Sequence, residues 1–432
     1  MVKSPSRVTI FSYQVGFGDC FLLRFDYPDR PRHVLIDFGT TKLPDSAPKD
    51  QLKQIALDIK KKVGGKRLDA VVATHRHADH ISGFATNAAG SASGDIIAEL
   101  EVGVVLQPWT EQLDLKANAL GPKVGTGKQL QSRRLGLMEM HETSASILRM
   151  LDSKAMSSMP KALAAQMRFI GEDNLKNKPA VENLATMGKK RVYAYHGSNS
   201  GLGAVLPGIK VHVLGPPTLK QSEKIRKQRA KDPNEFWHLT LRRLTAAQAN
   251  LDRSAALFPG HPTMRASKLP LSLRWIASRL KAAQGEQLLG ILRALDEQMN
   301  NTSLILLFEA GKKKKKLLFP GDAQIENWQH ALASEKYMKL LQDVDLYKVG
   351  HHGSLNATPK TMWAAFKKRG PKTAKGRLTS MLSTLPGKHG HEKSGTEVPR
   401  TTLLSALKTE SELHSTHTMN PNHLCEEVTI DL

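Results

Sequence analysis

Four side chains of the kinds that bind metal ions lie within six positions of one another: His75, His77, Asp79 and His80. Imidazole nitrogens and carboxylate oxygens are ligands for zinc and neighbouring first-row metals. The apolar, β-branched run at residues 68–73 comes directly before them and predicts a buried strand. Because α/β proteins place their chemistry at the carboxyl ends of strands, we expect a metal site in this turn.

Two later segments follow the same plan of a strand that ends in metal ligands. The apolar residues 317–319 lead through Pro-Gly to Asp322, and residues 346–349 lead to the adjacent His351 and His352. A polar surface loop that holds three histidines by chance is the alternative interpretation of the first cluster. The later segments favour a single site built from three strand ends.

Together these residues resemble the metallo-β-lactamase superfamily, whose pattern is His-x-His-x-Asp-His, then a later Asp and a later His. Within this superfamily, the sequence motifs are most similar to those of the hydrolase domain of ComEC-type DNA-uptake proteins and their soluble relatives. The similarity rests on Gly-Phe-Gly-Asp at 16–19, Asn-Thr-Ser-Leu at 301–304 and His-His-Gly-Ser at 351–354. It covers roughly residues 7–110, 191–218 and 300–410. The resemblance implies an α/β fold, a four-layer αβ/βα sandwich, which here carries two helical inserts.

The resemblance also implies two divalent metal ions, zinc or alternatively manganese. The first ion is expected to be held by His75, His77 and a bridging Asp322, with water filling the remaining positions. The turn at 214–218 adds no ligand, although most dinuclear members supply a histidine there. The ligands of the second ion are expected to be Asp79, His80, Asp322 and one of the pair His351 and His352. We favour His351, which directly follows a glycine.

The chemistry expected of such a site is hydrolysis. Two divalent ions about 3.5–4 Å apart can bridge a hydroxide near neutral pH and polarise the scissile oxygen. Asp79 is expected to orient this nucleophile and to accept a proton. His391, in a turn that resembles the family's late Asn-x-x-x-His-Pro, is the candidate acid for the leaving group, with a surface histidine as the alternative. Ser354 is expected to donate to a phosphate oxygen, whereas Asp19 and Asp37 are expected to hold the ligand turns by hydrogen bonding.

The pattern of strands and helices predicts five segments. Residues 1–110 form the first half of the fold, 111–190 a helical insert or lid, 191–218 further core strands, 219–299 a basic helical insert and 300–432 the second half.

Charge points to polyanionic partners. The formal net charge is +23, which favours nucleic acid or an anionic surface. Residues 219–299 hold fifteen Lys or Arg against seven Asp or Glu and are a candidate for tracking phosphates. The five lysines at 312–316 lie between two apolar runs, and we interpret them as the solvated tip of a β-hairpin in preference to a phosphate clamp.

Three classes of function are compatible with these features. The favoured one is a metal-dependent phosphodiesterase or nuclease. The first alternative is a hydrolase of a small ester, lactone or thioester, for which so basic a chain would be unusual. The second is a nucleic-acid-binding or partner-gated protein of a defence or mobile-element system, with a weak or regulated metal site and inserts that bind a protein partner.

The remaining features predict a cytoplasmic protein. No apolar stretch approaches the roughly eighteen residues that span a bilayer, and the amino terminus has no signal-peptide core. Two cysteines, Cys20 and Cys425, exclude a disulfide framework. The sequence predicts no oligomeric state.

Overall fold

A computed structural model describes residues 4–112, 178–222, 299–354, 357–389, 397–420 and 423–432, with isolated positions between 121 and 167. The chain divides into two compact units. Residues 1–132, 176–222 and 299–432 form the first unit, and residues 133–175 and 223–298 form the second. The second lies almost wholly outside the described residues, as do most of the two predicted inserts. The fold described below is that of the first unit.

The first sheet has seven strands in the order β13-β1-β2-β3-β4-β5-β6. The strands are β1 Arg7–Tyr13, β2 Cys20–Asp26, β3 Arg32–Phe38, β4 Arg67–Val72, β5 Glu101–Pro108, β6 Lys190–Ala194 and β13 Cys425–Asp431. Strands β3 to β6 are parallel, whereas β13, β1, β2 and β3 pair antiparallel. This sheet contains the predicted strand before the first ligand cluster.

The second sheet has six strands in the order β12-β11-β10-β9-β8-β7. The strands are β7 Lys210–Gly215, β8 Ile305–Ala310, β9 Lys315–Phe319, β10 Leu346–Lys348, β11 Thr379–Leu382 and β12 Glu412–Ser415. Strands β7, β8 and β9 pair antiparallel, and β9 to β12 are parallel. The parallel neighbours β9 and β10 therefore end at the same edge of the sheet.

Alternation along the strands builds a sandwich of four layers. In β2, Phe21, Leu23 and Phe25 belong to a core shared with Leu306 and Phe308 of the second sheet. Cys20 and Leu22 of β2 belong to a second core beneath the helices α1 (Gln51–Lys62), α3 (Ser93–Ala98) and α6 (Lys178–Thr186). A third core joins the second sheet to the helices α10 (Ile325–Leu332), α11 (Glu335–Gln342), α12 (Lys360–Ala365) and α13 (Thr401–Glu410).

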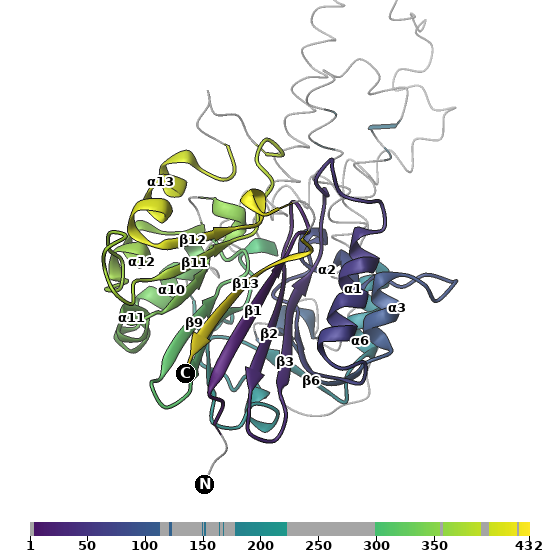
Figure 1. The fold of residues 1–432 in the computed structure, drawn as a ribbon, viewed down its shortest axis with the longest axis horizontal. Helices are drawn as coiled ribbons and strands as arrows, with labels where there is room; N and C mark the ends of the chain where they lie inside the picture. The colour runs from purple at the N-terminus through teal and green to yellow at the C-terminus, as the bar shows by residue number, and fades with distance from the viewer. Residues whose placement is uncertain are drawn as a thin grey trace, which may run out of the picture. The chain divides into compact units, whose positions relative to one another are not determined.

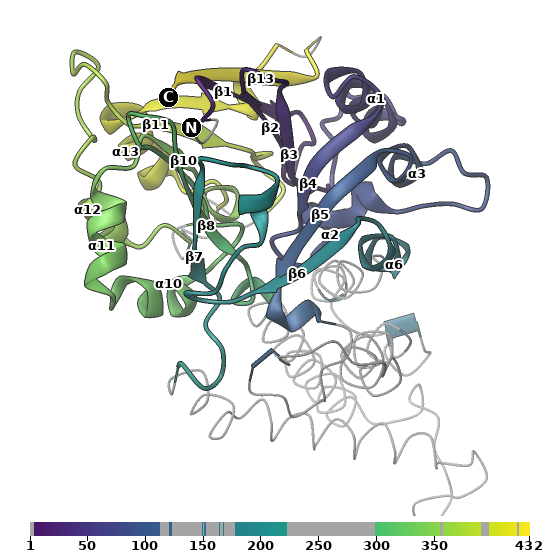
Figure 2. The ribbon, with the colours of Figure 1, turned by 90° about the horizontal axis from the view of Figure 1, so that it is seen from below.

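The two helical layers lie on the outer faces of the two sheets, as Figures 1 and 2 show. The predicted αβ/βα sandwich is confirmed. Burial of strand side chains on both faces explains why the core strands are continuously apolar in the sequence.

The last strand, β13, lies at the C-terminal end of the chain and belongs to the first sheet. The C-terminal end of the chain has only weak patterning, yet β13 pairs antiparallel with β1 and completes the edge of the first sheet (Figure 1). Glu426 and Glu427 interrupt its apolar pattern, because an edge strand keeps one side in solvent. Among the described residues, no helix is long and apolar enough to cross a membrane.

Candidate metal centre

Four buried side chains meet at the carboxyl ends of β4, β9 and β10: Asp79, His80, Asp322 and His352. One ligand atom from each lies within 4.8 Å of the others. His80 Nε2 is 3.0 Å from Asp322 Oδ2, and His352 Nε2 is 3.0 Å from Asp79 Oδ2. The three sequence segments predicted to form one site are thus brought together.

A second group consists of His75, His77 and Asp79, all buried. His75 Nε2 and His77 Nδ1 are 3.0 Å apart. Asp79 belongs to both groups, whereas the sequence analysis gave the bridging role to Asp322. The reason lies in the short helix α2 (Ala78–Ile81), which turns the Asp79 carboxylate inward between the two sets of histidines.

The ligand turn is held by Asp37, at the end of β3. Its carboxylate accepts hydrogen bonds from the Thr74 backbone N–H (2.7 Å), the Thr74 hydroxyl (2.7 Å) and His80 Nδ1 (2.8 Å). The bond to Nδ1 fixes the tautomer and leaves His80 Nε2 directed at Asp322. Asp37 adopts a positive φ of 55°, a conformation that few non-glycine residues adopt.

His352, not the favoured His351, lies in the four-residue group. His352 is fully buried, and its Nδ1 donates to the carbonyl of Ser383 (3.1 Å), which leaves Nε2 facing the carboxylates. His351 is 25% exposed, with Nε2 3.8 Å from Asp322 Oδ2. Both histidines have positive φ in the turn after β10, and this tight backbone directs the second ring inward. The preference for His351 stays a prediction, and in this structure His352 is the residue of the pair that joins the group.

The donor set fits a metal ion. Asp79 Oδ1, His80 Nε2 and Asp322 Oδ2 are buried without a well-directed hydrogen bond, and His80 Nε2 and Asp322 Oδ2 lie 3.0 Å apart as an ion pair. Buried polar atoms in proteins are nearly always well hydrogen-bonded, so a cluster of buried donor atoms in this arrangement fits a shared metal ion. Nitrogen and carboxylate oxygen in this combination suit zinc or manganese.

Burial and neighbouring charges separate the pKa values of the histidines. Burial lowers the pKa of His75 well below its ordinary value and lowers that of His77 to about 4. Burial also opposes protonation of His80, but the carboxylates of Asp322 and Asp37 raise its pKa well above the ordinary value. Protons therefore compete with a metal ion at His80, whereas His75 and His77 are neutral at pH 7.

Lys348 is a residue of this centre that the sequence analysis missed. Its side chain is buried at the end of β10, and Nζ forms an ion pair with Asp19 Oδ2. Nζ also lies 3.7 Å from Asp322 Oδ1 and donates to the carbonyl of Gly321 (3.4 Å). A single lysine within the apolar run Leu-Tyr-Lys-Val is the signal that could have revealed it. Asp19 was expected to hold a ligand turn, and its backbone N–H does donate to the carbonyl of Asp79 (2.8 Å).

The two other predicted site residues are His391 and Ser354. His391 falls outside the described residues. Ser354 is half-buried just after the His352 turn, with its N–H bonded to the His351 carbonyl (2.9 Å). His389 lies near the site, because its ring packs on Phe17 at 4.5 Å and Phe17 packs on His352 at 4.3 Å. Burial lowers the pKa of His389 to about 4, so it is neutral near pH 7 and a poor proton donor.

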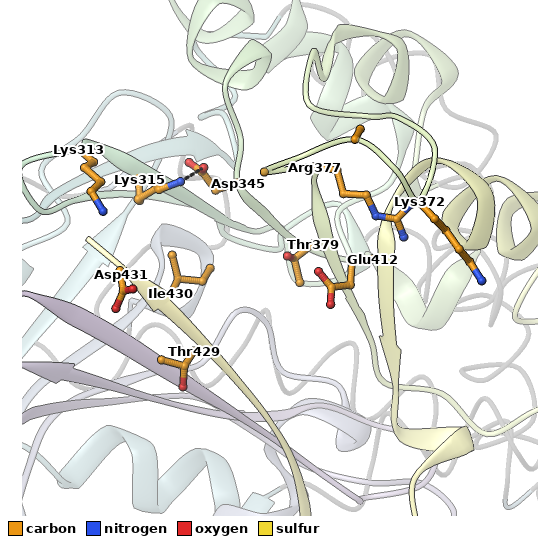
Figure 3. Close-up of a pocket in the computed structure, with 12 residues that line it drawn as sticks. Lys313, Lys315, Asp345, Lys372, Arg377, Thr379, Glu412, Thr429, Ile430 and Asp431 are labelled. Atoms are coloured by element: carbon orange, nitrogen blue, oxygen red, sulfur yellow. Dashed lines mark hydrogen bonds and ion pairs between the residues drawn. The ribbon is translucent and has the colours of Figure 1, made fainter.

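The lysine-rich hairpin lies at the other end of β9 from Asp322. Lys312, Lys313 and Lys314 at its tip are exposed. A hollow of about 560 Å³ beside the hairpin is lined by basic and acidic side chains together (Figure 3). In it Lys315 pairs with Asp345 at 2.8 Å, as Figure 3 shows. The mixed charges make this hollow a solvated polar surface.

Comparison with known proteins finds a similarity in the first part of the chain. The model of the metallo-beta-lactamase superfamily matches residues 13–87, which include Asp19, Asp37 and the whole turn from His75 to His80. No curated protein matches this sequence. The superfamily match and the cluster of histidines and aspartates together support a metal-dependent hydrolase.

Proposed function

We propose that this protein is a phosphodiesterase that uses two divalent metal ions, zinc or manganese, and acts on nucleic acid or another phosphodiester polyanion. The observation that carries the proposal is the convergence of four buried side chains, Asp79, His80, Asp322 and His352, at the ends of three strands. His75, His77 and Asp79 would hold the first ion, and the four-residue group the second.

Bound divalent ions would acidify a water molecule and polarise the scissile oxygen. The chain's own residues prepare this chemistry. Asp37 orients His80, and the Ser383 carbonyl orients His352, so that both present Nε2 to the site. Asp79 lies between the two groups, where its carboxylate can orient the attacking water and take up its proton. The leaving group would be protonated by His391 or by solvent, and Ser354 would donate to a phosphate oxygen.

The choice of a phosphodiester substrate rests on charge. A net charge of +23 attracts polyanions and raises their local concentration, and it offers nothing to a neutral lactone or thioester. The basic segment 219–299 is the part of the chain best suited to bind a phosphate backbone. Partner proteins would bind through the inserts.

The test uses the full chain, stripped of metal by chelation and then supplied with zinc or manganese. The substrates are bis-p-nitrophenyl phosphate, single- and double-stranded DNA, and RNA, with p-nitrophenyl acetate as the uncharged comparison. Asp322→Ala is the inactive variant. Asp343→Ala is its matched control, because that carboxylate is 59% exposed and pairs only with Lys316 in the structure.

We expect metal-dependent phosphodiester cleavage that Asp322→Ala lowers by at least about a hundredfold and Asp343→Ala leaves unchanged. Cleavage of nucleic acid should weaken steeply with salt, because each phosphate contact releases about one counterion. Turnover of the acetate alone would overturn the proposal in favour of a small-ester hydrolase. Salt-sensitive nucleic-acid binding without any cleavage would favour the binding protein.

A further inference from the structure

A third set of potential metal ligands lies behind the two groups already described. Asp19, Asp37 and His80 each offer a ligand atom within 4.8 Å of the others, and all three are buried. The Asp37 carboxylate is satisfied by its three hydrogen bonds, whereas neither oxygen of Asp19 accepts one. Asp19 therefore needs a cation, because a buried charge without a partner costs several kcal/mol. By geometry alone, this triad would accept a divalent ion.

In the structure this cation is the ammonium group of a lysine side chain, Lys348. Lys348 reaches the triad from the end of β10, and its ammonium pairs with Asp19 Oδ2. The same nitrogen is 3.7 Å from Asp322 Oδ1, which belongs to the second metal group. Lys348 is thus the one buried ammonium, among the described residues, in contact with carboxylates of the centre.

We propose that Lys348 is a positioning residue that takes the place of a third metal ion. By pairing with Asp19 it keeps divalent ions out of the Asp19–Asp37–His80 triad. Asp37 is then left to orient His80, whose Nε2 serves the second metal group. This inference rests on the proposed function only in assuming that two ions bind to the native chain.

The alternative is that Lys348 only stabilises the fold, and the two roles differ in a measurable way. If Lys348 excludes a metal ion, its removal must add a binding site. Removing Asp19 instead must leave an ammonium free to compete for Asp322, which weakens metal binding. If Lys348 is merely structural, each change weakens metal binding and the double change is at least as harmful.

The experiment measures zinc stoichiometry by equilibrium dialysis and zinc affinity by competition with a chromophoric chelator, on the full-length chain. The variants are Lys348→Met, Asp19→Asn and the double variant, which carries neither charge and therefore leaves none unpaired if a single variant fails to fold. Lys315→Met is the matched control, because Lys315 also pairs with an aspartate on its sheet but at the far end of β9. Circular dichroism checks the folding of each protein.

We expect two ions in the native chain, three in Lys348→Met and two in the double variant. We expect Asp19→Asn to lower zinc affinity about tenfold or more and the double variant to restore most of it, since charged residues in contact are coupled. Additive losses in the double variant, or an unchanged stoichiometry in Lys348→Met, would overturn the inference. A native chain that binds neither zinc nor manganese would instead refute the proposed function.

Discussion

At the scale of single residues, the hydrogen bond on one ring nitrogen decides which nitrogen of a histidine faces the centre. His80 Nδ1 is bonded to Asp37, and His352 Nδ1 is bonded to the Ser383 carbonyl. Each histidine therefore presents Nε2, although the partners come from different sheets. His351 and His352 are adjacent in the sequence, but it is His352 that is fully buried and donates to the Ser383 carbonyl just after β11.

This difference predicts unequal effects of two neighbouring substitutions. His352→Ala should lose about one zinc ion per chain and lower phosphodiester cleavage by more than about a hundredfold. Even the loss of a residue that only orients a metal ligand typically lowers metal affinity or activity by about 10- to 100-fold. His351→Ala should keep both ions and change turnover by less than about tenfold, because its ring lies at the exposed rim of the site. Metal analysis of dialysed proteins and initial rates measure both effects, and equal losses of zinc would contradict the assignment.

At the scale of elements, the site depends on backbones that approach more closely than side chains allow. A Cβ atom on Gly39, after β3, would lie 2.4 Å from the carbonyl oxygen of Ala78 and 2.5 Å from the N–H nitrogen of His80. A Cβ atom on Gly18 would lie 2.7 Å from the carbonyl oxygen of Asp79. These glycines let the turns after β1 and β3 lie directly against α2.

Gly39→Ala should therefore displace the ligand turn. We expect the free energy of unfolding to fall by about 1–3 kcal/mol, as is usual when a well-packed site is overfilled, and zinc affinity to fall with it. Gly203→Ala is the matched control, because no atom lies within 4 Å of its Cβ position, and it should change stability by less than about 0.5 kcal/mol. Urea unfolding and chelator competition give the two quantities. Full zinc affinity in Gly39→Ala would show that the close approach does not position the turn.

The elements that the sequence predicts well are those with a local signal. The apolar run at 68–73 corresponds to β4, Arg67–Val72, and the lysine-rich hairpin corresponds to β8 and β9. Features that depend on distant contacts were not predictable: the pairing of β13 with β1, the ion pair between Lys348 and Asp19, and the inward position of His352. Each of them joins residues that are hundreds of positions apart or depends on a backbone conformation with positive φ.

At the scale of the whole molecule, the two sheets form one core, and charge is kept outside it or paired within it. Asp69, at the start of β4, is fully buried and pairs with Arg30 and Arg67, while its Oδ2 accepts the backbone N–H of His33. Burial lowers the pKa of the His33 ring from 6.5 to about 4, and Asp69 offsets only part of this effect. The fold therefore holds a neutral imidazole that the unfolded chain would protonate in mild acid.

The lowered pKa of His33 makes global stability sensitive to acid. Between about pH 6.5 and pH 4 the unfolded chain binds a proton at His33 that the folded chain does not, so stability falls as the pH falls through this window. A shift of this size corresponds to about 3 kcal/mol. His33→Gln should remove this contribution to the pH dependence of stability. The free energy of unfolding of the variant should therefore decline less steeply from pH 6.5 to pH 4 than that of the native chain. From pH 7 to pH 8 the two slopes should coincide, because the imidazole is then neutral in both states. Urea unfolding at a fixed zinc concentration and a series of pH values measures the slopes. Parallel slopes in the acid window would mean that His33 is protonated within the folded sandwich and that burial does not control its charge.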